Sequence, residues 1–532
     1  MAEELLAYPD WTEYKKKSGL DPLGMQNSSI NLYQRLLPGI SNVTLRVRYY
    51  GFYAWLALIY ARRSGDTNPK TWQKFIRRAE AVYALAAQVR GDEGGMAGIL
   101  WAQRILAPDQ ESVVEFARHS DPDGDGTPYL QQAWGAYGVA YASQVFEIGI
   151  YADAKDHPIP VPSPELGEAI AREFEDAAGP LADRFFETVE RGSVSRADLE
   201  AFSVLTPSGL GGEGAERQLY EDMLFAEGQL KRPADLSRRH TLLLLLHVAS
   251  HLGRRPTVME ARWLLYAGAD QENQQFAIEA PVLREQRLRW WVYQANDLLH
   301  YSYETLLKYS LDTLENYPAG IALNTLIAEL VSALSEADRN WPPTWRDFLT
   351  SQPPAQNANG DSPNSERSLV EVIAPTSGSN HKTTPEAAWA ALRLLAVVAN
   401  RAQTESAAIG AALGHLDREG FRSLVTEMSF LNASDDEPFA RTMARIIEER
   451  VLKRHLWVAH RKFRYQNDYT FLIEADDGRV RLRAESGPVL TNPRLGPAIT
   501  FLEDIHLIDA DGVTARGKAL LAAIMHDATG FA

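Results

Sequence analysis

The stretch Ser41–Arg63, SNVTLRVRYYGFYAWLALIYARR, decides the fold class that we predict for this chain. Apolar residues recur there at the three- and four-residue steps of one helical face, at Val43, Val47, Tyr50, Ala54, Leu58 and Ala61. A second apolar set covers the opposite side, at Leu45, Tyr49, Phe52, Leu56 and Ile59. Ser41 or Asn42 can cap the first turn. We therefore expect a central helix that is buried on all sides.

Arginines flank the apolar part of this stretch. Only 13 uncharged residues separate Arg48 from Arg62, whereas a membrane-spanning helix needs roughly 20. The basic start allows two interpretations of Arg46 and Arg48. We favour ion pairs with acidic residues of neighbouring helices, and the alternative is an anion pocket completed by tyrosine hydroxyls. The candidate hydroxyls belong to Tyr49, Tyr50 and Tyr53.

The composition is that of a globular protein with an acidic balance. Of 532 residues, 45% are hydrophobic and 23% are charged, and the formal net charge is −16. This charge disfavours diffuse binding to nucleic acid or anionic lipid, so a nucleic-acid site would have to be a local basic patch. The absence of cysteine excludes disulfides and cysteine-based zinc sites. Residues 1–20 show no signal-peptide pattern, and we expect a cytoplasmic protein without membrane contact or cofactor.

Length and patterning predict a mainly α fold, with a multi-helical body in three parts. We expect an N-terminal helical domain at 1–268, a second helical region at 269–435, and a C-terminal domain at 436–532. Residues 352–384 begin with QPPAQNANGDSPNSERS, whose proline, asparagine, serine and glycine content predicts a disordered insertion or linker.

The last hundred residues change character. Two short strand patterns, Tyr469–Glu474 and Arg479–Glu485, flank Asp476-Asp477-Gly478, a favourable hairpin turn. A helical pattern ending in FLEDIHLI, a short strand ending in threonine, and a last helix follow. This order resembles the closing half of a winged-helix domain, which implies a small α/β fold over about the last 40 residues. A helical body with such an end is also similar to proteins of bacterial antiviral defence or mobile-element complexes.

The strongest local signal is basic. Between Arg441 and Arg464, eight lysines and arginines stand against two glutamates. Guanidinium groups in a row suit phosphate contacts, and nearby aromatic rings offer stacking surface for bases. The candidate nucleic-acid-binding residues are Arg454, Arg461, Lys462, Arg464, Arg479, Arg481, Arg483 and Arg494. The alternative is that this basic face docks on acidic helices of the same chain or on an acidic protein partner.

Arg450 and His455 stand at the spacing Arg-x4-His within this basic segment. The pattern resembles the catalytic motif of HEPN-type ribonucleases, helical enzymes that attack RNA at the 2′-hydroxyl. The resemblance implies that His455 would act as general base and that Arg450 would stabilise phosphate charge. Val451 departs from the family pattern, in which a polar residue often follows the arginine.

Three further constellations have both structural and functional interpretations. His247 and His251 stand at the i, i+4 spacing of zinc ligands, but no carboxylate lies between them, so we favour packed histidines and no metal. Asn296, His300 and Glu304 form a polar stripe on a long helix, which suits acid–base chemistry or an inter-helix seam. An acidic loop copies half of a calcium-binding loop, at Asp121, Asp123 and Asp125.

The sequence therefore predicts a non-enzymatic binding or scaffold subunit of a multi-subunit complex. Its basic C-terminal region would contact nucleic acid or a protein partner. The alternative is a metal-independent ribonuclease that uses Arg450 and His455, and a third possibility is a purely structural subunit.

Overall fold

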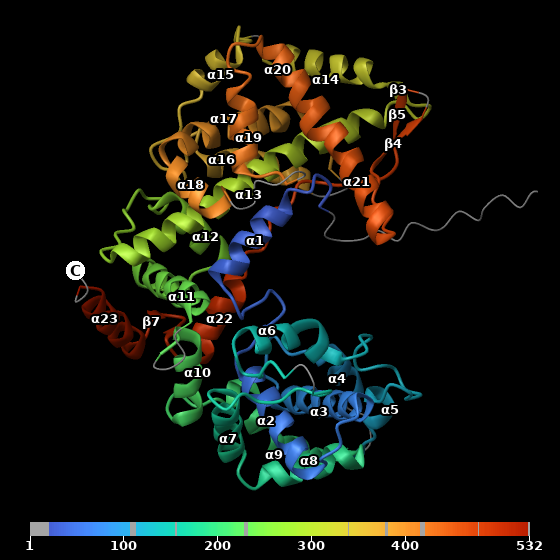
Figure 1. The fold of residues 1–532 in the computed structure, drawn as a ribbon, viewed down its shortest axis with the longest axis vertical. Coiled ribbons are helices and arrows are strands. Elements are labelled where there is room, and N and C mark those ends of the chain that lie inside the picture. The colour runs from blue at the N-terminus through green and yellow to red at the C-terminus, as the bar shows by residue number, and fades with distance from the viewer. Residues whose placement is uncertain are drawn as a thin grey trace, which may run out of the picture. The chain divides into compact units, whose positions relative to one another are not determined.

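The structure, a computed structural model, is built mainly from helices, and the predicted mainly α fold class is confirmed. It describes residues 21–106, 113–154, 157–227, 232–338, 340–377, 381–414, 421–476 and 478–529. Within these residues the strands form one three-stranded and two two-stranded sheets. Figure 1 shows the helices and strands in chain order by colour.

The chain forms two compact units whose segments alternate along the sequence. Unit 1 comprises residues 1–28, 296–354 and 368–490, and unit 2 comprises residues 29–295, 355–367 and 491–532. These boundaries differ from the predicted boundaries at 268 and 435. One reason is that residues near the C-terminus pack with N-terminal helices: Asp504 forms an ion pair with Arg46 at 2.9 Å.

Unit 2 holds the central helix predicted from the sequence. Its helices are α2 (Arg48–Arg63), α3 (Pro69–Arg90), α4 (Ile99–Ile105), α5 (Ala117–Ser120), α6 (Ala142–Glu147), α7 (Gly167–Ala178), α8 (Leu181–Arg191), α9 (Arg196–Phe202), α10 (Ala215–Phe225), α11 (Pro233–Leu252), α12 (Val258–Ala267), α22 (Leu495–Asp504) and α23 (Ala515–Thr529). Its paired strands are β1 (Val113–Val114) with β2 (Val194–Ser195), and β6 (Ile508–Asp509) with β7 (Gly512–Val513). Three of the described helices contribute residues to both units, α1 (Gln26–Leu36), α13 (Pro281–Leu314) and α16 (Glu366–Ile373).

Helix α2 is buried on nearly all sides from Arg48 to Tyr60, as its apolar pattern predicted. Val43 and Leu45 of that pattern precede the helix and are exposed. Phe52 stacks on Tyr83 of α3, with ring centroids 4.1 Å apart, and α7 packs against α2 (Figure 1). The helix begins at Arg48 rather than near Ser41, so the predicted cap is wrong. The carboxylate of Asp504 accepts the Val47 N–H at 2.9 Å at the helix start, a contact that local sequence could not indicate.

Unit 1 surrounds the C-terminal half of α13. Its other helices are α14 (Leu323–Ala337), α15 (Trp345–Ser351), α17 (Pro385–Thr404), α18 (Ser406–Leu413), α19 (Leu424–Asn432), α20 (Phe439–Arg445) and α21 (Lys453–Gln466). A π-helical turn at Ile446–Leu452 joins α20 to α21, so the long basic helix predicted from Phe439 to Arg464 is present with one irregular turn.

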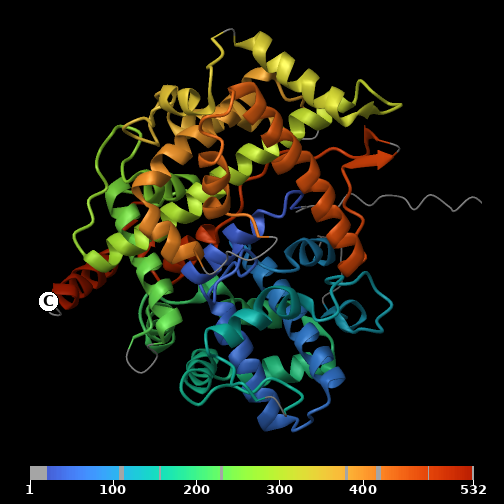
Figure 2. The same cartoon turned by 45° about the horizontal axis from the view of Figure 1, so that its top comes forward.

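The predicted hairpin follows α21. Strands β4 (Ile473–Asp476) and β5 (Arg479–Leu482) pair antiparallel, and β5 also pairs with β3 (Ile321–Ala322). Asp477 of the expected turn lies outside the described residues. Both ribbon views show this hairpin beside α21 (Figures 1 and 2). The hairpin and α21 belong to unit 1, whereas α22 and α23 belong to unit 2.

The segment at 352–384 is structured over its described residues, contrary to the predicted disorder. It contains helix α16 (Glu366–Ile373), and residues 378–380 lie outside the described part. Asn357 donates its side-chain amide to the Asp270 carbonyl at 2.6 Å, and Asn359 donates to the Ala269 carbonyl at 3.2 Å. Polar side chains therefore order the segment by bonding to backbone, which composition does not reveal.

Candidate nucleic-acid interface

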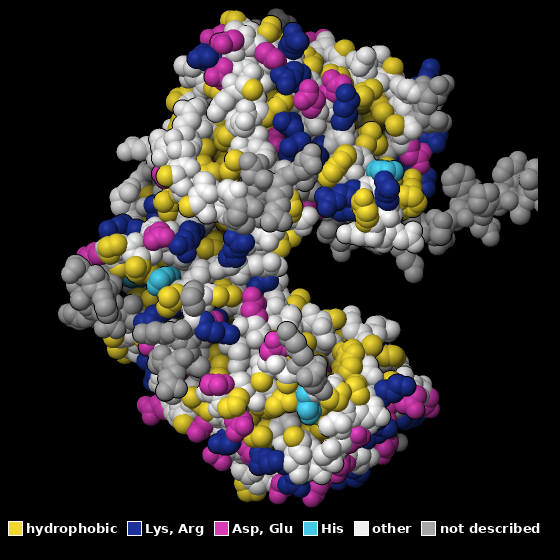
Figure 3. Space-filling view, in the orientation of Figure 1, with side chains coloured by type: hydrophobic (Ala, Val, Ile, Leu, Met, Phe, Trp, Pro, Cys, Tyr) yellow, Lys and Arg dark blue, Asp and Glu magenta, His cyan; other side chains and the backbone are white. Residues whose placement is uncertain are grey.

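A groove in unit 1 runs along α21 and has a volume of about 990 Å³. Its lining is basic, with the lysines and arginines Arg422, Lys453, Arg454, Arg461, Lys462 and Arg464. Glu449 is the acidic residue among the lining residues, and His460 adds a group that can become positively charged. Lysine and arginine side chains gather beside hydrophobic ones over this region in Figure 3. The groove is therefore a local positive site on an acidic chain.

Helix periodicity places the central groove residues together. Trp457, Arg461 and Arg464 stand at i, i+4 and i+7 of α21, so they share one face of the helix. Arg464 stands in the last turn of α21, where a positive side chain also interacts favourably with the helix dipole. This part of the predicted basic surface is thus assembled by a single regular element.

Arg461 and Arg464 are the exposed arginines among the residues that line the groove. Neither forms an ion pair with a carboxylate among the described residues, whereas Lys453 pairs with Glu448 at 2.7 Å. Both guanidinium groups lie over aromatic rings: Arg461 is 5.4 Å from the Trp457 ring centroid, and Arg464 is 5.6 Å from that of Tyr465. These two arginines keep their charge available to an anionic ligand.

Two other predicted residues line the groove but direct hydrogen bonds into the protein. Arg454 is buried, and its Nε donates to the Leu23 carbonyl at 2.8 Å. Burial, together with the charge of Arg422, lowers the pKa of Arg454 to about 10. Lys462 donates to the Asp21 carbonyl at 2.8 Å. Both side chains therefore bind the backbone of the segment before α1, and their charges add to the positive potential of the groove.

The arginines of β5, Arg479 and Arg481, and Arg483 just after the strand contribute less positive charge than the alternating pattern predicted. Arg481 pairs with Glu474 on the neighbouring strand at 2.7 Å, and Arg483 lies 3.5 Å from the same carboxylate. Arg479 is exposed and donates to the Gly320 carbonyl at 3.4 Å. One glutamate thus neutralises much of the predicted row of arginines.

Arg494 is not part of this surface. It belongs to unit 2, where it is buried, donates to the Leu37 carbonyl at 3.2 Å and lies over the Tyr33 ring. Arg494 was predicted to belong to the basic cluster only because it lies close to the cluster along the chain. Proximity along the chain was therefore a wrong guide for this residue.

Arg450 and His455 do not form a catalytic pair. His455 is fully buried, its Nδ1 lies 3.1 Å from the Pro22 carbonyl, and its Nε2 accepts the Leu472 N–H at 2.9 Å. Burial lowers the pKa of His455 to about 4, so the ring is neutral at pH 7. Arg450 pairs with Glu427 at 3.3 Å. No ring nitrogen remains to act as general base, which argues against the ribonuclease alternative.

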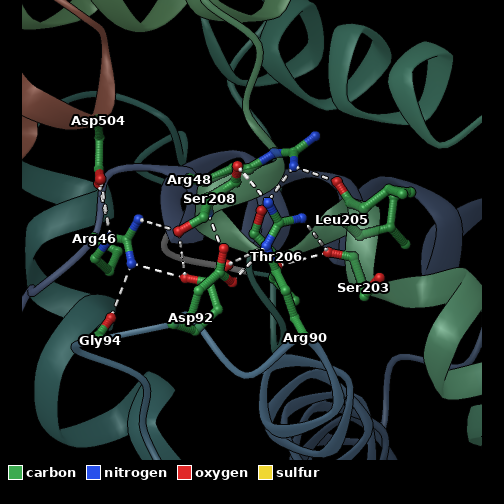
Figure 4. Close-up of polar contacts among 12 residues, drawn as sticks. Arg46, Arg48, Arg90, Asp92, Gly94, Ser203, Leu205, Thr206, Ser208 and Asp504 are labelled. Atoms are coloured by element: carbon green, nitrogen blue, oxygen red, sulfur yellow. Dashed lines mark hydrogen bonds and ion pairs between the residues drawn. The ribbon is translucent and has the colours of Figure 1, made fainter.

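Arg46 and Arg48 form buried ion pairs rather than an anion pocket (Figure 4). Arg46 binds the carboxylates of Asp504 at 2.9 Å and Glu93 at 2.8 Å, and Arg48 binds both carboxylate oxygens of Glu216 at 2.9 Å. Carbonyl oxygens occupy further donors of both guanidinium groups. The favoured interpretation of the sequence therefore agrees with the geometry.

The tyrosines proposed for that pocket, Tyr49, Tyr50 and Tyr53, are buried, and two of them donate their hydroxyls within the protein. Tyr50 donates its hydroxyl to the Gly39 carbonyl at 2.6 Å, and Tyr53 donates to buried Glu80 at 2.7 Å. A second groove, of about 730 Å³, lies beside Arg46. Its charges are balanced, since Arg255 pairs with Glu503 at 3.0 Å. This groove offers no excess charge to a ligand.

The other constellations are structural. His251 Nε2 lies 3.0 Å from Asp270, and within the described residues no group of three or more potential ligands surrounds a metal position. His300 is buried between Asp297 at 3.3 Å and Glu304 at 3.0 Å. Burial by itself would lower the pKa of His300. The two carboxylates raise it by more than burial lowers it, so the pKa lies well above its ordinary value of 6.5. The acidic loop is tied by ion pairs, as between Asp121 and Arg78 at 2.6 Å.

Two features of the groove were missed in the sequence. Arg422 precedes α19, some thirty residues before α21, and no periodicity connects it to the basic helix. Gly24 and Asn27, from the start of the described chain, also line the groove. Only packing within unit 1 brings these residues together.

Comparisons of the chain with family models, curated proteins and solved structures find no match. The winged-helix resemblance of the last residues therefore stays a prediction. In the described part of the chain, no helix combines the length and apolar character needed to cross a bilayer.

Proposed function

We propose that this chain is a non-enzymatic nucleic-acid-binding subunit whose binding surface is the basic groove of α21. The observation that carries the proposal is the pair of exposed arginines, Arg461 and Arg464, which have no carboxylate partner among the described residues. Phosphate groups are the abundant anionic ligands that such guanidinium groups bind well.

The charge of the whole chain strengthens this interpretation. A net charge of −16 repels nucleic acid from most of the surface, so a positive groove would confine contact to one place. Several other arginines are neutralised by carboxylates, as in the pair between Arg48 and Glu216. What marks the groove is that two arginines without a carboxylate partner among the described residues, Arg461 and Arg464, line one basic surface together.

The proposal is tested by fluorescence anisotropy of the purified chain with labelled DNA and RNA across a salt series. The variant Arg461→Glu/Arg464→Glu should weaken binding by at least tenfold. Because two phosphate contacts are removed, the slope of log affinity against log salt should fall by about two.

The matched control is Lys70→Glu/Arg104→Glu, which makes the same charge change at exposed positions of unit 2. This control should bind like the unmodified chain. Absence of binding by the unmodified chain at low salt would overturn the proposal. Equal weakening by the control would show that net charge, and not the groove, governs binding.

A further inference from the structure

The surface at the C-terminal end of α21 is aromatic as well as basic. Among the described residues, five phenylalanine, tyrosine or tryptophan side chains are exposed, and four of these five belong to this region. These are Trp457, Phe463, Tyr465 and Tyr469, with exposed fractions of 44%, 47%, 73% and 39%. Large exposed aromatic rings concentrated in one place indicate a binding surface.

We propose that the groove takes single-stranded nucleic acid, with unpaired bases stacked on Trp457 and Tyr465 and phosphates bound by Arg461 and Arg464. This inference rests on the proposed function and specifies its ligand. It concerns which form of nucleic acid fits the groove, and so it can fail while nucleic-acid binding itself holds.

The spacing of the two rings suits a short stretch of strand. Trp457 and Tyr465 are eight residues apart on α21, which corresponds to a rise of about 12 Å along the helix. At a stacked spacing of about 3.4 Å, this length accommodates roughly three or four nucleotides. Arg461 and Arg464 lie between the rings in sequence, so that phosphates of the same stretch can reach them.

The arginines and the rings are already positioned against each other. The guanidinium group of buried Arg454 lies 4.4 Å from the centroid of the Trp457 ring. The guanidinium group of exposed Arg461 lies 5.4 Å from the same centroid. The contact with buried Arg454 fixes the ring, whereas the exposed guanidinium can move onto a phosphate. The Trp457 ring is therefore held in place before a ligand binds.

A second aromatic group continues the surface onto the hairpin. The Phe463 and Tyr469 rings meet edge to face at 6.2 Å, Tyr469 lies 5.2 Å from Phe471, and Arg483 lies 5.9 Å from the Tyr469 ring. This group repeats the combination of ring and guanidinium found in the groove. A strand longer than the groove would meet the same chemistry there.

Stacking distinguishes single strands from duplexes. Inside a duplex the faces of the bases are covered by neighbouring base pairs, so that an exposed ring on a protein has no base face to contact. In a single strand every base offers its face, and stacking depends little on base identity. We therefore expect a preference for single strands without strong sequence specificity.

The test measures anisotropy of the full chain with three probes, a labelled 12-nucleotide oligo(dT), a 12-nucleotide oligo(rU) and a 12-base-pair duplex. The unmodified chain should bind one or both single strands at least tenfold more tightly than the duplex. The variant Trp457→Ala/Tyr465→Ala should lose about 100-fold in single-strand affinity, because stacking contributes about tenfold or more per base. Its salt slope should remain unchanged, since phosphate contacts are retained.

Two controls make the result specific. Trp457→Phe/Tyr465→Phe keeps ring faces and should restore most of the affinity, and Phe146→Ala removes the exposed aromatic of unit 2 and should change nothing. Duplex binding as tight as single-strand binding, or full affinity in the alanine variant, would overturn the inference while leaving the proposed function intact. Failure to bind any of the three probes at low salt would instead remove the proposed function.

Discussion

His455 and Leu472 are joined by a hydrogen bond of 2.9 Å, from the Leu472 backbone N–H to Nε2 of the imidazole. The other ring nitrogen bonds the Pro22 carbonyl, so one buried side chain connects α21, the approach to β4 and the segment before α1. This histidine therefore joins three segments of unit 1 through one buried ring.

Replacing His455 by alanine should destabilise unit 1 by about 3 kcal/mol. The substitution leaves a buried N–H and a buried carbonyl without partners and opens a cavity. Denaturant unfolding followed by circular dichroism measures the loss. His460→Ala, at an exposed position of the same helix, should change stability by less than about 0.5 kcal/mol. RNA cleavage that disappears only in His455→Ala would contradict the structural role assigned here.

The stability of the chain should fall as pH decreases from 6.5 towards 4, in part through His455. Its pKa is lowered to about 4 in the folded state, so in this range the unfolded chain binds a proton that the folded chain does not. The full effect is about 3 kcal/mol. The free energies of unfolding of the unmodified chain and of His455→Gln, measured across this pH range, should approach each other as the pH falls. A constant difference between them would be inconsistent with this pKa.

Asp504 should make the stability of the chain depend on pH in the opposite direction to His455. Burial raises its pKa to about 6 despite its pairing with Arg46, so the folded chain takes up a proton there more readily than the unfolded chain. The stability that Asp504 contributes is present below pH 4 and is lost as pH rises through 6, by about 3 kcal/mol. Asp504→Asn should therefore gain stability relative to the unmodified chain between pH 4 and 7. A relative stability that does not change with pH would refute the expected shift.

The ion pair between Arg48 and Glu216 should be essential to unit 2. Glu216→Gln leaves a buried guanidinium without its counter-charge, and we expect a loss of about 3 to 5 kcal/mol in the free energy of unfolding. Glu200→Gln provides the comparison, because its partner Arg196 is exposed and such pairs contribute less than about 1 kcal/mol. Thermal unfolding of both variants measures the difference. Similar melting temperatures would indicate that Arg48 finds another partner.

The sequence by itself determined the regular elements. The two apolar faces of α2 predicted a helix buried on all sides, because a helix without a polar face has to be covered by others. The helical pattern over Phe439–Arg464 predicted the segment that contains α21, and the Asp-Gly turn with flanking strand patterns predicted the hairpin of β4 and β5. These features follow from side-chain periodicity over a few neighbouring residues.

Only the tertiary structure decided which charges remain available. Arg46 and Arg461 look alike in sequence, yet Arg46 is bound by Asp504, 458 residues away, and Arg461 has no carboxylate partner among the described residues. The order of the 352–384 segment likewise depends on side-chain bonds to Asp270 and Ala269. The physical reason is the same in each case: the charge or hydrogen-bonding capacity of a side chain depends on partners that the chain brings close only when it folds.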